Sequence, residues 1–157
     1  MSSLQIWLKS AVMALFLILP TVVQAQAPQF ETGRLVIQTA SGIRHEFTVE
    51  RATSPAQREV GLMHRTVLDA DHGMLFDFGT PRTVMMWMKN TPLPLDMLFI
   101  DDTGLVIRIE SRTTPFSESI IASGGIVRFV LEINGGRSEA LGIAAGDQVV
   151  EGLDDGR

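Results

Sequence analysis

Apolar and polar residues alternate with a period of two in several segments, a pattern that predicts β-strands with one buried face. Residues 43–49 give the clearest case, because Ile, His, Phe and Val alternate there with Arg, Glu and Thr. Residues 34–39 precede this segment across a short Ala-Ser-Gly connection, which predicts a hairpin. Residues 127–133 repeat the alternation and place Glu132 on the face opposite to the apolar one.

Further segments of strand length follow one another between turn residues. They cover residues 74–78, 84–89, 97–100, 105–110 and 148–151. The Asp-Asp-Thr-Gly run at 101–104 is typical of a turn, so we expect its two flanking segments to form a hairpin. Asn134 and two glycines end the strand that begins at residue 127, and a short helical turn is expected over residues 137–141.

Signals for a helix are concentrated in residues 53–63. Ser54 is a favourable N-cap, Pro55 suits the first helical position, and Gln57 can complete a capping box. Helical spacing predicts that three apolar residues face the core: Ala56, Val60 and Met63. Gly61 inside a helix costs about 1 kcal/mol relative to alanine, so it either permits close packing or marks an early end of the helix.

Many short strands and one convincing helix do not fit alternating βαβ units. We therefore predict a mainly β (α+β) domain. Its antiparallel sheet is expected to curl into a sandwich or a partly open barrel, with one or two short helices.

The first 27 residues have the pattern of a secretory signal peptide. Lys9 supplies the positive n-region, residues 11–19 supply the apolar h-region, and Ala25 and Ala27 offer a small-residue cleavage site. The apolar run is shorter than the roughly 20 residues that span a bilayer, and an uncleaved anchor is the alternative. We expect a periplasmic or secreted monomer in which residues 28–157 form one domain that is not integrated in the membrane.

The composition of this domain argues against several classes of protein. After residue 27 the chain has 12 positive and 18 negative side chains, a formal charge of −6. Nucleic acid binding needs a concentrated basic face, so no nucleic acid partner is expected. The chain has no cysteine, which rules out disulfides, thiol nucleophiles and a lipoprotein anchor. Because the glycine motifs for nucleotides and the hydrolase elbow are also missing, we expect no cofactor.

Metal binding is not favoured either. The three histidines, at positions 45, 64 and 72, have no close ligand spacing, and His45 lies on an apolar strand face, as a core histidine does. The methionines offer thioether ligands for Cu(I), which is the alternative. Along one strand, however, Met85 points away from Met86, and methionine is a common filler of irregular cores. We therefore predict no metal site.

The rarest residue types of the domain are concentrated in residues 87–90, Trp-Met-Lys-Asn. After residue 27, Lys89 is the only lysine beside 11 arginines, and Trp87 is the only tryptophan. On the predicted strand both side chains share one face. Two prolines stiffen the turn that follows, and Asp96 opens the next strand, near Lys89. These residues predict a pocket with an aromatic floor, a cation, a carboxylate and the amide of Asn90.

Two further residues are candidates for the same site. Arg65 follows the helix and could reach an anionic ligand, although an exposed arginine is more often solvated. Glu132 is expected to be solvated from its alternation, but a curled sheet would bring its face beside Trp87. In that case Asp96 and Glu132 could form the pair of carboxyls that hydrolyses a glycosidic bond, which lie either about 5 Å or about 6.5–9.5 Å apart.

Five short runs occur in an order that is similar to a known family. They are residues 61–65 (GLMHR), 73–76 (GMLF), 87–91 (WMKNT), 94–96 (PLD) and 131–134 (LEIN). They resemble the family of domain of unknown function 192 (DUF192), often exported bacterial and archaeal proteins, over about residues 45–151. Met86 stands where that family pattern suggests a second aromatic residue, a departure that would enlarge a neighbouring pocket. The resemblance implies a fold and an important block of residues, but no activity.

We therefore predict an exported domain that binds a small polar or anionic ligand, for example one from the cell envelope. Trp87 would pack on the ligand, Lys89 would hold its charge, and Asn90 and Asp96 would orient it. The alternative is a structural or protein-interaction domain without a small-molecule ligand. An enzyme, of the hydrolase type with Lys89, Asp96 and Glu132, ranks third, because a carboxylate beside Lys89 would keep it charged and unreactive.

Overall fold

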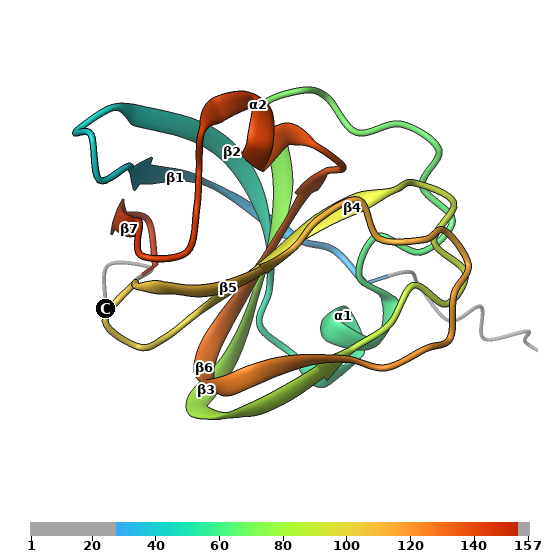
Figure 1. The fold of residues 1–157 in the computed structure, drawn as a ribbon. Helices are drawn as coiled ribbons and strands as arrows, with labels where there is room; N and C mark the ends of the chain where they lie inside the picture. Colours follow the sequence, from blue (N-terminus) through green and yellow to red (C-terminus); the bar gives the residue numbers. More distant parts are fainter. Residues whose placement is uncertain (1–27, 154–157) are drawn as a thin grey trace, which may run out of the picture.

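The computed structural model describes residues 28–153, and the predicted signal peptide lies outside the described residues. One curled, seven-stranded sheet dominates the fold and forms a half-barrel (Figure 1). The elements are β1 (Glu31–Gln38), β2 (Arg44–Ala52), α1 (Pro55–Val60), β3 (His72–Met86), β4 (Leu95–Ile100), β5 (Val106–Glu110), β6 (Ile121–Asn134), α2 (Arg137–Leu141) and β7 (Gln148–Glu151). The strand order is β5-β4-β6-β3-β2-β1-β7. The predicted mainly β class, with short helices, is confirmed.

Both predicted hairpins are present. β1 and β2 are antiparallel with Leu35 opposite Phe47, and β4 and β5 are antiparallel with Leu98 opposite Ile109. The two edge strands of the sheet also approach each other, because Leu105 and Gln148 form a bridge and Val149 N–H donates to the Gly104 carbonyl at 2.8 Å. The curled sheet therefore comes close to forming a barrel.

The strands predicted at residues 74–78 and 84–89 belong to one long strand, β3, which ends at Met86. Its pairing with β6 changes register between Asp77 and Arg82, where Gly79 has a φ of 78°. Glycine adopts this left-handed conformation without a steric penalty, so the strand can bend and continue. The prediction of two separate short strands was wrong, because the turn-like residues between them make an irregularity within a strand.

Helix α1 starts as predicted but packs differently. Ser54 Oγ accepts from Gln57 N–H at 3.2 Å, and Gln57 Oε1 accepts from Ser54 N–H at 2.8 Å, which completes the capping box. Gly61, with a φ of 48°, ends the helix. The prediction that Ala56 and Val60 face the core was wrong, because both are exposed and the helix has no buried residue. The core is covered instead by Leu62, just after the helix.

The short helix connects two parallel strands, β2 and β3, with Thr48 opposite His72. This pair is the parallel exception in a sheet whose other pairs are antiparallel. It places α1 and the residues after it over one face of the sheet, beside the long strands (Figure 1).

Both faces of the sheet are buried, and each has its own core. The first core contains Leu35, Ile37, Phe47, Val49, Leu75, Leu98, Ile100, Val106, Phe129, Leu131, Ile133, Ile143 and Val149. The second core contains Ala52, Leu62, Met74, Phe76, Val84, Met88, Leu95, Met97, Phe99, Val127 and Val130. Glu132 alternates with the residues of the first core on β6, so it lies on the face of the second core. Within residues 28–153, no helix is long and apolar enough to span a membrane.

Replacing Ser54 by alanine is expected to lower the free energy of unfolding by about 1 kcal/mol, because the helix loses its N-cap hydrogen bond. Urea denaturation of wild type and variant would measure this loss. Ser119→Ala is the matched control, since this exposed serine has no side-chain hydrogen bond within the described part of the chain. Equal stability of the two variants would contradict a contribution from the capping box.

Candidate functional site

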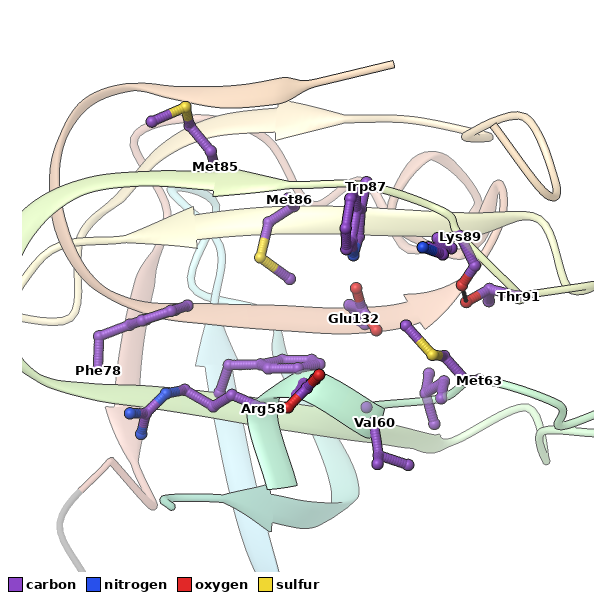
Figure 2. A pocket seen from close by; sticks show the side chains of 14 residues that line it. Arg58, Val60, Met63, Phe78, Met85, Met86, Trp87, Lys89, Thr91 and Glu132 are labelled. Atoms are coloured by element: carbon purple, nitrogen blue, oxygen red, sulfur yellow. Dashed lines mark hydrogen bonds between the residues drawn. The ribbon is translucent and has the colours of Figure 1, made fainter. Parts of the chain in front are cut away.

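A pocket lies between the residues that follow α1 and the segment that leads out of β3 (Figure 2). Its volume is about 120 Å³. It is lined by Arg58, Glu59, Val60, Gly61, Leu62, Met63, Phe76, Phe78, Met85, Met86, Trp87, Lys89, Thr91 and Glu132. For comparison, an apolar cavity of about 150 Å³ can hold a benzene ring. The pocket is therefore suited to a small molecule or to one end of a larger molecule.

Hydrogen bonds between two loops hold the pocket walls in place. Lys89 and Asn90 form a turn after β3, in which Asn90 has a φ of 55°, a conformation that asparagine tolerates better than most residues. The carbonyl of Asn90 accepts from His64 N–H at 2.8 Å, and its amide donates to the sulfur of Met63 at 3.8 Å. Asn90 thus joins the turn to the segment after α1 but does not itself line the pocket.

Trp87 and Lys89 lie beside each other at the mouth of the pocket. The Lys89 Nζ atom is 5.1 Å from the centre of the Trp87 ring, within the range of a cation–π interaction. Trp87 is 43% exposed, so it forms a wall at the mouth and not the predicted floor. Lys89 has no ion pair within the described residues. Its charge is therefore available to a ligand.

Glu132 forms the floor of the pocket. It lies on β6 between Met74 of β3 and Met97 of β4, which are its partners on the neighbouring strands. Its carboxyl points into the space below Trp87 and Lys89 (Figure 2). The residue is only 5% exposed, and the prediction of a solvated side chain was wrong. The alternative expectation, that a curled sheet brings Glu132 beside Trp87, is confirmed.

Burial changes the acid–base chemistry of this carboxyl. Desolvation raises the pKa of Glu132 from 4.5 to about 8, because the charged form loses its hydration in the apolar pocket. Within residues 28–153 no side chain or backbone group forms a hydrogen bond or ion pair with the carboxyl that would compensate this loss. Glu132 is therefore mostly neutral at neutral pH, and a neutral carboxyl can donate a hydrogen bond.

Asp96 lies elsewhere, as the register of the sheet requires. On β4, Asp96 is opposite Ile133 and Met97 is opposite Glu132, so Asp96 and Glu132 point to opposite faces. The two carboxyls therefore do not form the pair proposed for hydrolysis. Asp96 does not line the pocket, and no ion pair between it and Lys89 occurs in the described residues.

The carboxylate of Asp96 instead organises the chain around α2. It is fully buried and accepts from Arg112 N–H and Gly136 N–H at 2.8 Å, and from Ser138 N–H at 2.9 Å and the Ser138 hydroxyl. Burial alone would raise the pKa of Asp96, but the hydrogen bonds from Ser138, Gly136 and Arg112 lower it below its ordinary value. Asp96 is thus an ionised structural residue.

Arg65 also has a partner outside the pocket. Its guanidinium donates to both carboxylate oxygens of Glu50, at 2.7 and 2.6 Å. Glu50 raises the pKa of Arg65 through this bidentate pair, although partial burial opposes it. The structure therefore brings Trp87, Lys89 and Glu132 together, but not Arg65, Asn90 or Asp96.

Several pocket residues were not identified from the sequence as ligand contacts. The apolar walls include Met63, Phe76, Phe78 and Met86. Of these residues, only Met86 could have been identified from the sequence. It stands where the family pattern suggests an aromatic residue, and this departure was expected to enlarge a neighbouring pocket. The aromatic residues and Arg58 gave no signal, because α1 and β3 approach each other only in the folded chain.

The methionines do not converge on one point. Met86 and Met63 point toward Glu132, whereas Met85 points away and is 68% exposed (Figure 2). Met88 is buried in the second core. Among the described residues, no group of three or more His, Cys, Asp or Glu side chains is placed to hold a metal ion.

The comparisons with known proteins agree with this fold. The model of the DUF192 family, described as an uncharacterized ACR, matches residues 36–150. No curated protein matches the chain. A crystal structure from Sinorhizobium meliloti, described provisionally as a transcription regulator, is similar with a TM-score of 0.77 and 51% identity, over 78% of this chain and 95% of that one. A protein of unknown function from Novosphingobium aromaticivorans has a TM-score of 0.74 and 34% identity, over 85% and 99%. The chain therefore belongs to the DUF192 family, as the sequence resemblance implied.

Proposed function

We propose that this protein binds a small polar or anionic ligand in the pocket above Glu132. The observation that carries the proposal is the carboxyl of Glu132, a residue that is only 5% exposed and has no hydrogen-bond partner within residues 28–153. It faces a cavity that is also lined by Lys89, which has no ion pair in that part of the chain. A buried polar group usually has a hydrogen-bond partner, because burial without one costs free energy. A ligand would supply the partner that the protein itself does not.

The surroundings of the pocket support the same proposal. Methionine and aromatic side chains provide apolar walls, and a few polar groups converge in the cavity, which is the composition of small-molecule sites. The loops that form the walls are joined by the Asn90–His64 hydrogen bond, so little entropy is lost when a ligand binds. The signal-like pattern of the first 27 residues favours binding in the periplasm or outside the cell.

We do not extend the provisional description of the Sinorhizobium meliloti protein as a transcription regulator to this chain. After residue 27, negative side chains outnumber positive ones by 18 to 12. DNA-binding domains need a concentrated positive surface. The pocket is a stronger guide to function here than that description.

A protein-interaction role is the second candidate, and exposed apolar residues favour it. Met85 is 68% exposed, and Ile126 on the neighbouring strand β6 is 59% exposed. Exposed apolar residues that are grouped together can mark a protein interface. This candidate does not require Lys89 and Glu132 to face one cavity, whereas ligand binding does.

We expect a ligand from a broad panel to raise the melting temperature of wild type but not of Lys89→Met. The panel would contain sugars, peptidoglycan fragments, phosphorylated metabolites, carboxylates and Cu(I). A ligand at about 100 times its dissociation constant stabilises the folded state by about 2.7 kcal/mol. Differential scanning fluorimetry of both proteins would detect this shift.

Arg44→Met is the matched control, since it removes a half-exposed cation that pairs with Glu151 outside the pocket. Its ligand-induced shift should equal that of wild type. If no compound shifts the wild-type melting temperature and Lys89→Met is only less stable, the structural or protein-interaction role is favoured instead.

A further inference from the structure

The pocket contains two ionisable groups that do not satisfy each other. Lys89 and Glu132 both point into it, but their nitrogen and oxygen atoms do not come within 4.0 Å of each other, so they form no ion pair. The one charge-dependent contact of Lys89 in the described structure is with the Trp87 ring. Both side chains face the same space in Figure 2, so a ligand group bound there lies between them.

The chemistry of Glu132 restricts what that ligand group can be. Desolvation raises the pKa of the carboxyl to about 8, so below that pH its O–H needs a hydrogen-bond acceptor. The neighbouring strands face it with Met74, Phe76 and Met97, which carry no charge and accept hydrogen bonds weakly or not at all. A ligand that carries an acceptor would satisfy this O–H, which these neighbouring side chains do not.

The other charges around the pocket favour an anion. Helix α1 contributes Arg58 and Glu59, and the segment after β3 contributes Lys89. With Glu132 neutral, the lining has two basic side chains and one other acidic side chain, so one positive charge is in excess. Arg58 also donates to the backbone carbonyls of Thr53 and Asp77. Among the described cations of the lining, Lys89 is therefore the one without a hydrogen bond or ion pair to the protein. A cationic ligand would be repelled at the mouth.

We infer that the pocket takes a small organic carboxylate, whose oxygens contact the Lys89 ammonium and accept a hydrogen bond from the neutral Glu132 carboxyl. This inference rests on the proposed ligand-binding function and names its ligand class. The apolar part of the carboxylate lies against Met63, Met86 and Phe76. The cavity of about 120 Å³ limits the buried part to a few carbon atoms.

The ligand class is tested with butyrate, butyramide and butylamine, which are of similar size, and with the larger benzoate. Their dissociation constants are measured by NMR titration of the full chain from about pH 6.5 to about pH 9.5. Butyrate and benzoate are expected to bind, and the amide and amine are not. Ionised Glu132 would repel a carboxylate. The dissociation constants of butyrate and benzoate should therefore rise up to tenfold per pH unit above the pKa of Glu132, about 8.

Three variants separate the parts of the site. Glu132→Gln keeps a hydrogen-bond donor but cannot ionise, so its affinity for butyrate should not change with pH. Lys89→Met should lose butyrate binding at every pH. Arg44→Met, outside the pocket, should show the wild-type pH profile.

Several results would overturn the inference. Butyramide binding as tightly as butyrate, or butylamine binding more tightly as the pH rises, would reject the carboxylate but retain a ligand-binding pocket. If all four probes fail while another compound from the broad panel binds in a Lys89-dependent way, the inference alone fails. If neither set contains a ligand, the proposed function fails with it.

A second measurement tests whether the two groups pair directly in solution. The ¹³C signal of the Glu132 side-chain carboxyl is followed against pH in wild type and in Lys89→Met. We expect it to titrate near pH 8 in both proteins. A low wild-type midpoint that rises in Lys89→Met would show a Lys89–Glu132 ion pair, and would overturn the inference.

Discussion

The free energy of unfolding of this protein is expected to fall by about 1.4 kcal/mol for each pH unit between pH 4.5 and about pH 8. The cause is Glu132, which the folded state keeps protonated in an apolar pocket. In the unfolded chain the same carboxyl is hydrated and ionises near its ordinary pKa. Over this interval the folded state therefore binds one more proton than the unfolded state, and a rise in pH favours unfolding.

The total effect is large compared with the stability of a small domain. The pKa of Glu132 is raised in the folded state. The stability that the protonated carboxyl contributes to the free energy of unfolding is therefore fully present below pH 4.5 and is lost as the pH rises to about 8. The difference corresponds to about 5 kcal/mol, against a typical stability of about 5 to 15 kcal/mol. Carboxylates with a lowered pKa, such as Asp96 and Glu151, act in the opposite direction at lower pH.

Urea denaturation at several pH values tests this expectation. Glu132→Gln should remove the slope and should be more stable than wild type at pH values above neutral, since glutamine cannot ionise. Glu118→Gln is the matched control, because this exposed glutamate has no hydrogen bond or ion pair within residues 28–153. A wild-type profile as flat as that of Glu132→Gln would mean that the carboxyl is hydrated or paired in solution.

Asp96→Ala is expected to destabilise the protein by about 3 to 5 kcal/mol, the range for removing one partner from a buried, charged hydrogen-bond network. The variant leaves the N–H groups of Arg112, Gly136 and Ser138 without their acceptor. Those groups hold the loop before β6 and the start of α2 against β4. Loss of their common acceptor should loosen both segments at once.

Asp96→Asn tests the charge with little change in shape. One oxygen of Asp96 accepts from Arg112 and Gly136, and the other accepts from Ser138, so any orientation of an amide places its NH₂ group against at least one N–H donor. We expect a loss of about 2 kcal/mol or more, from the unsatisfied donors. Ser138→Ala, which removes a single hydroxyl donor to the ionised carboxylate, should cost about 1.5 to 3 kcal/mol.

Chemical denaturation and hydrogen exchange would distinguish these outcomes. The amides of Gly136 and Ser138 should lose protection in the Asp96 variants but not in Glu132→Gln. Because the pKa of Asp96 is lowered in the folded state, its stabilising contribution is present above its ordinary pKa of 3.8 and is lost as the pH falls below it. A stability change in Asp96→Ala no larger than that in Ser138→Ala would contradict the network.

The two acidic residues Asp96 and Glu132 have different roles on the two faces of the sheet. Asp96 and Glu132 lie on neighbouring strands, one residue out of register, and therefore on opposite faces. Asp96 is surrounded by donors and stabilises the fold, whereas Glu132 has no donor among residues 28–153 and destabilises the fold when it is ionised. A buried group that lowers stability is a common property of functional sites.

Local patterns in the sequence were sufficient for most individual elements. The alternation in residues 43–49 predicted β2, and the Ser54–Gln57 capping box predicted the start of α1. The turn at 101–104 predicted the hairpin of β4 and β5. These features depend on hydrogen bonds and turns between residues close in sequence, so local information decides them. The neighbouring positions of Trp87 and Lys89 could be predicted for the same reason.

The tertiary structure decided which side chains share a site. An alternating strand shows which residues lie on one face, but not whether that face is covered, and Glu132 was expected in solvent. It is buried because the parallel β2–β3 pair brings α1 and Leu62 over this face. Asp96 was expected beside Lys89, but its cross-strand register with Ile133 turns it to the other face. Sequence by itself determined most of the strands, the helix start and the neighbouring positions of Trp87 and Lys89, although β3 is one long strand that ends before this pair. The pairing of distant strands, which depends on packing across the whole sheet, decided that Glu132 and not Asp96 completes the pocket.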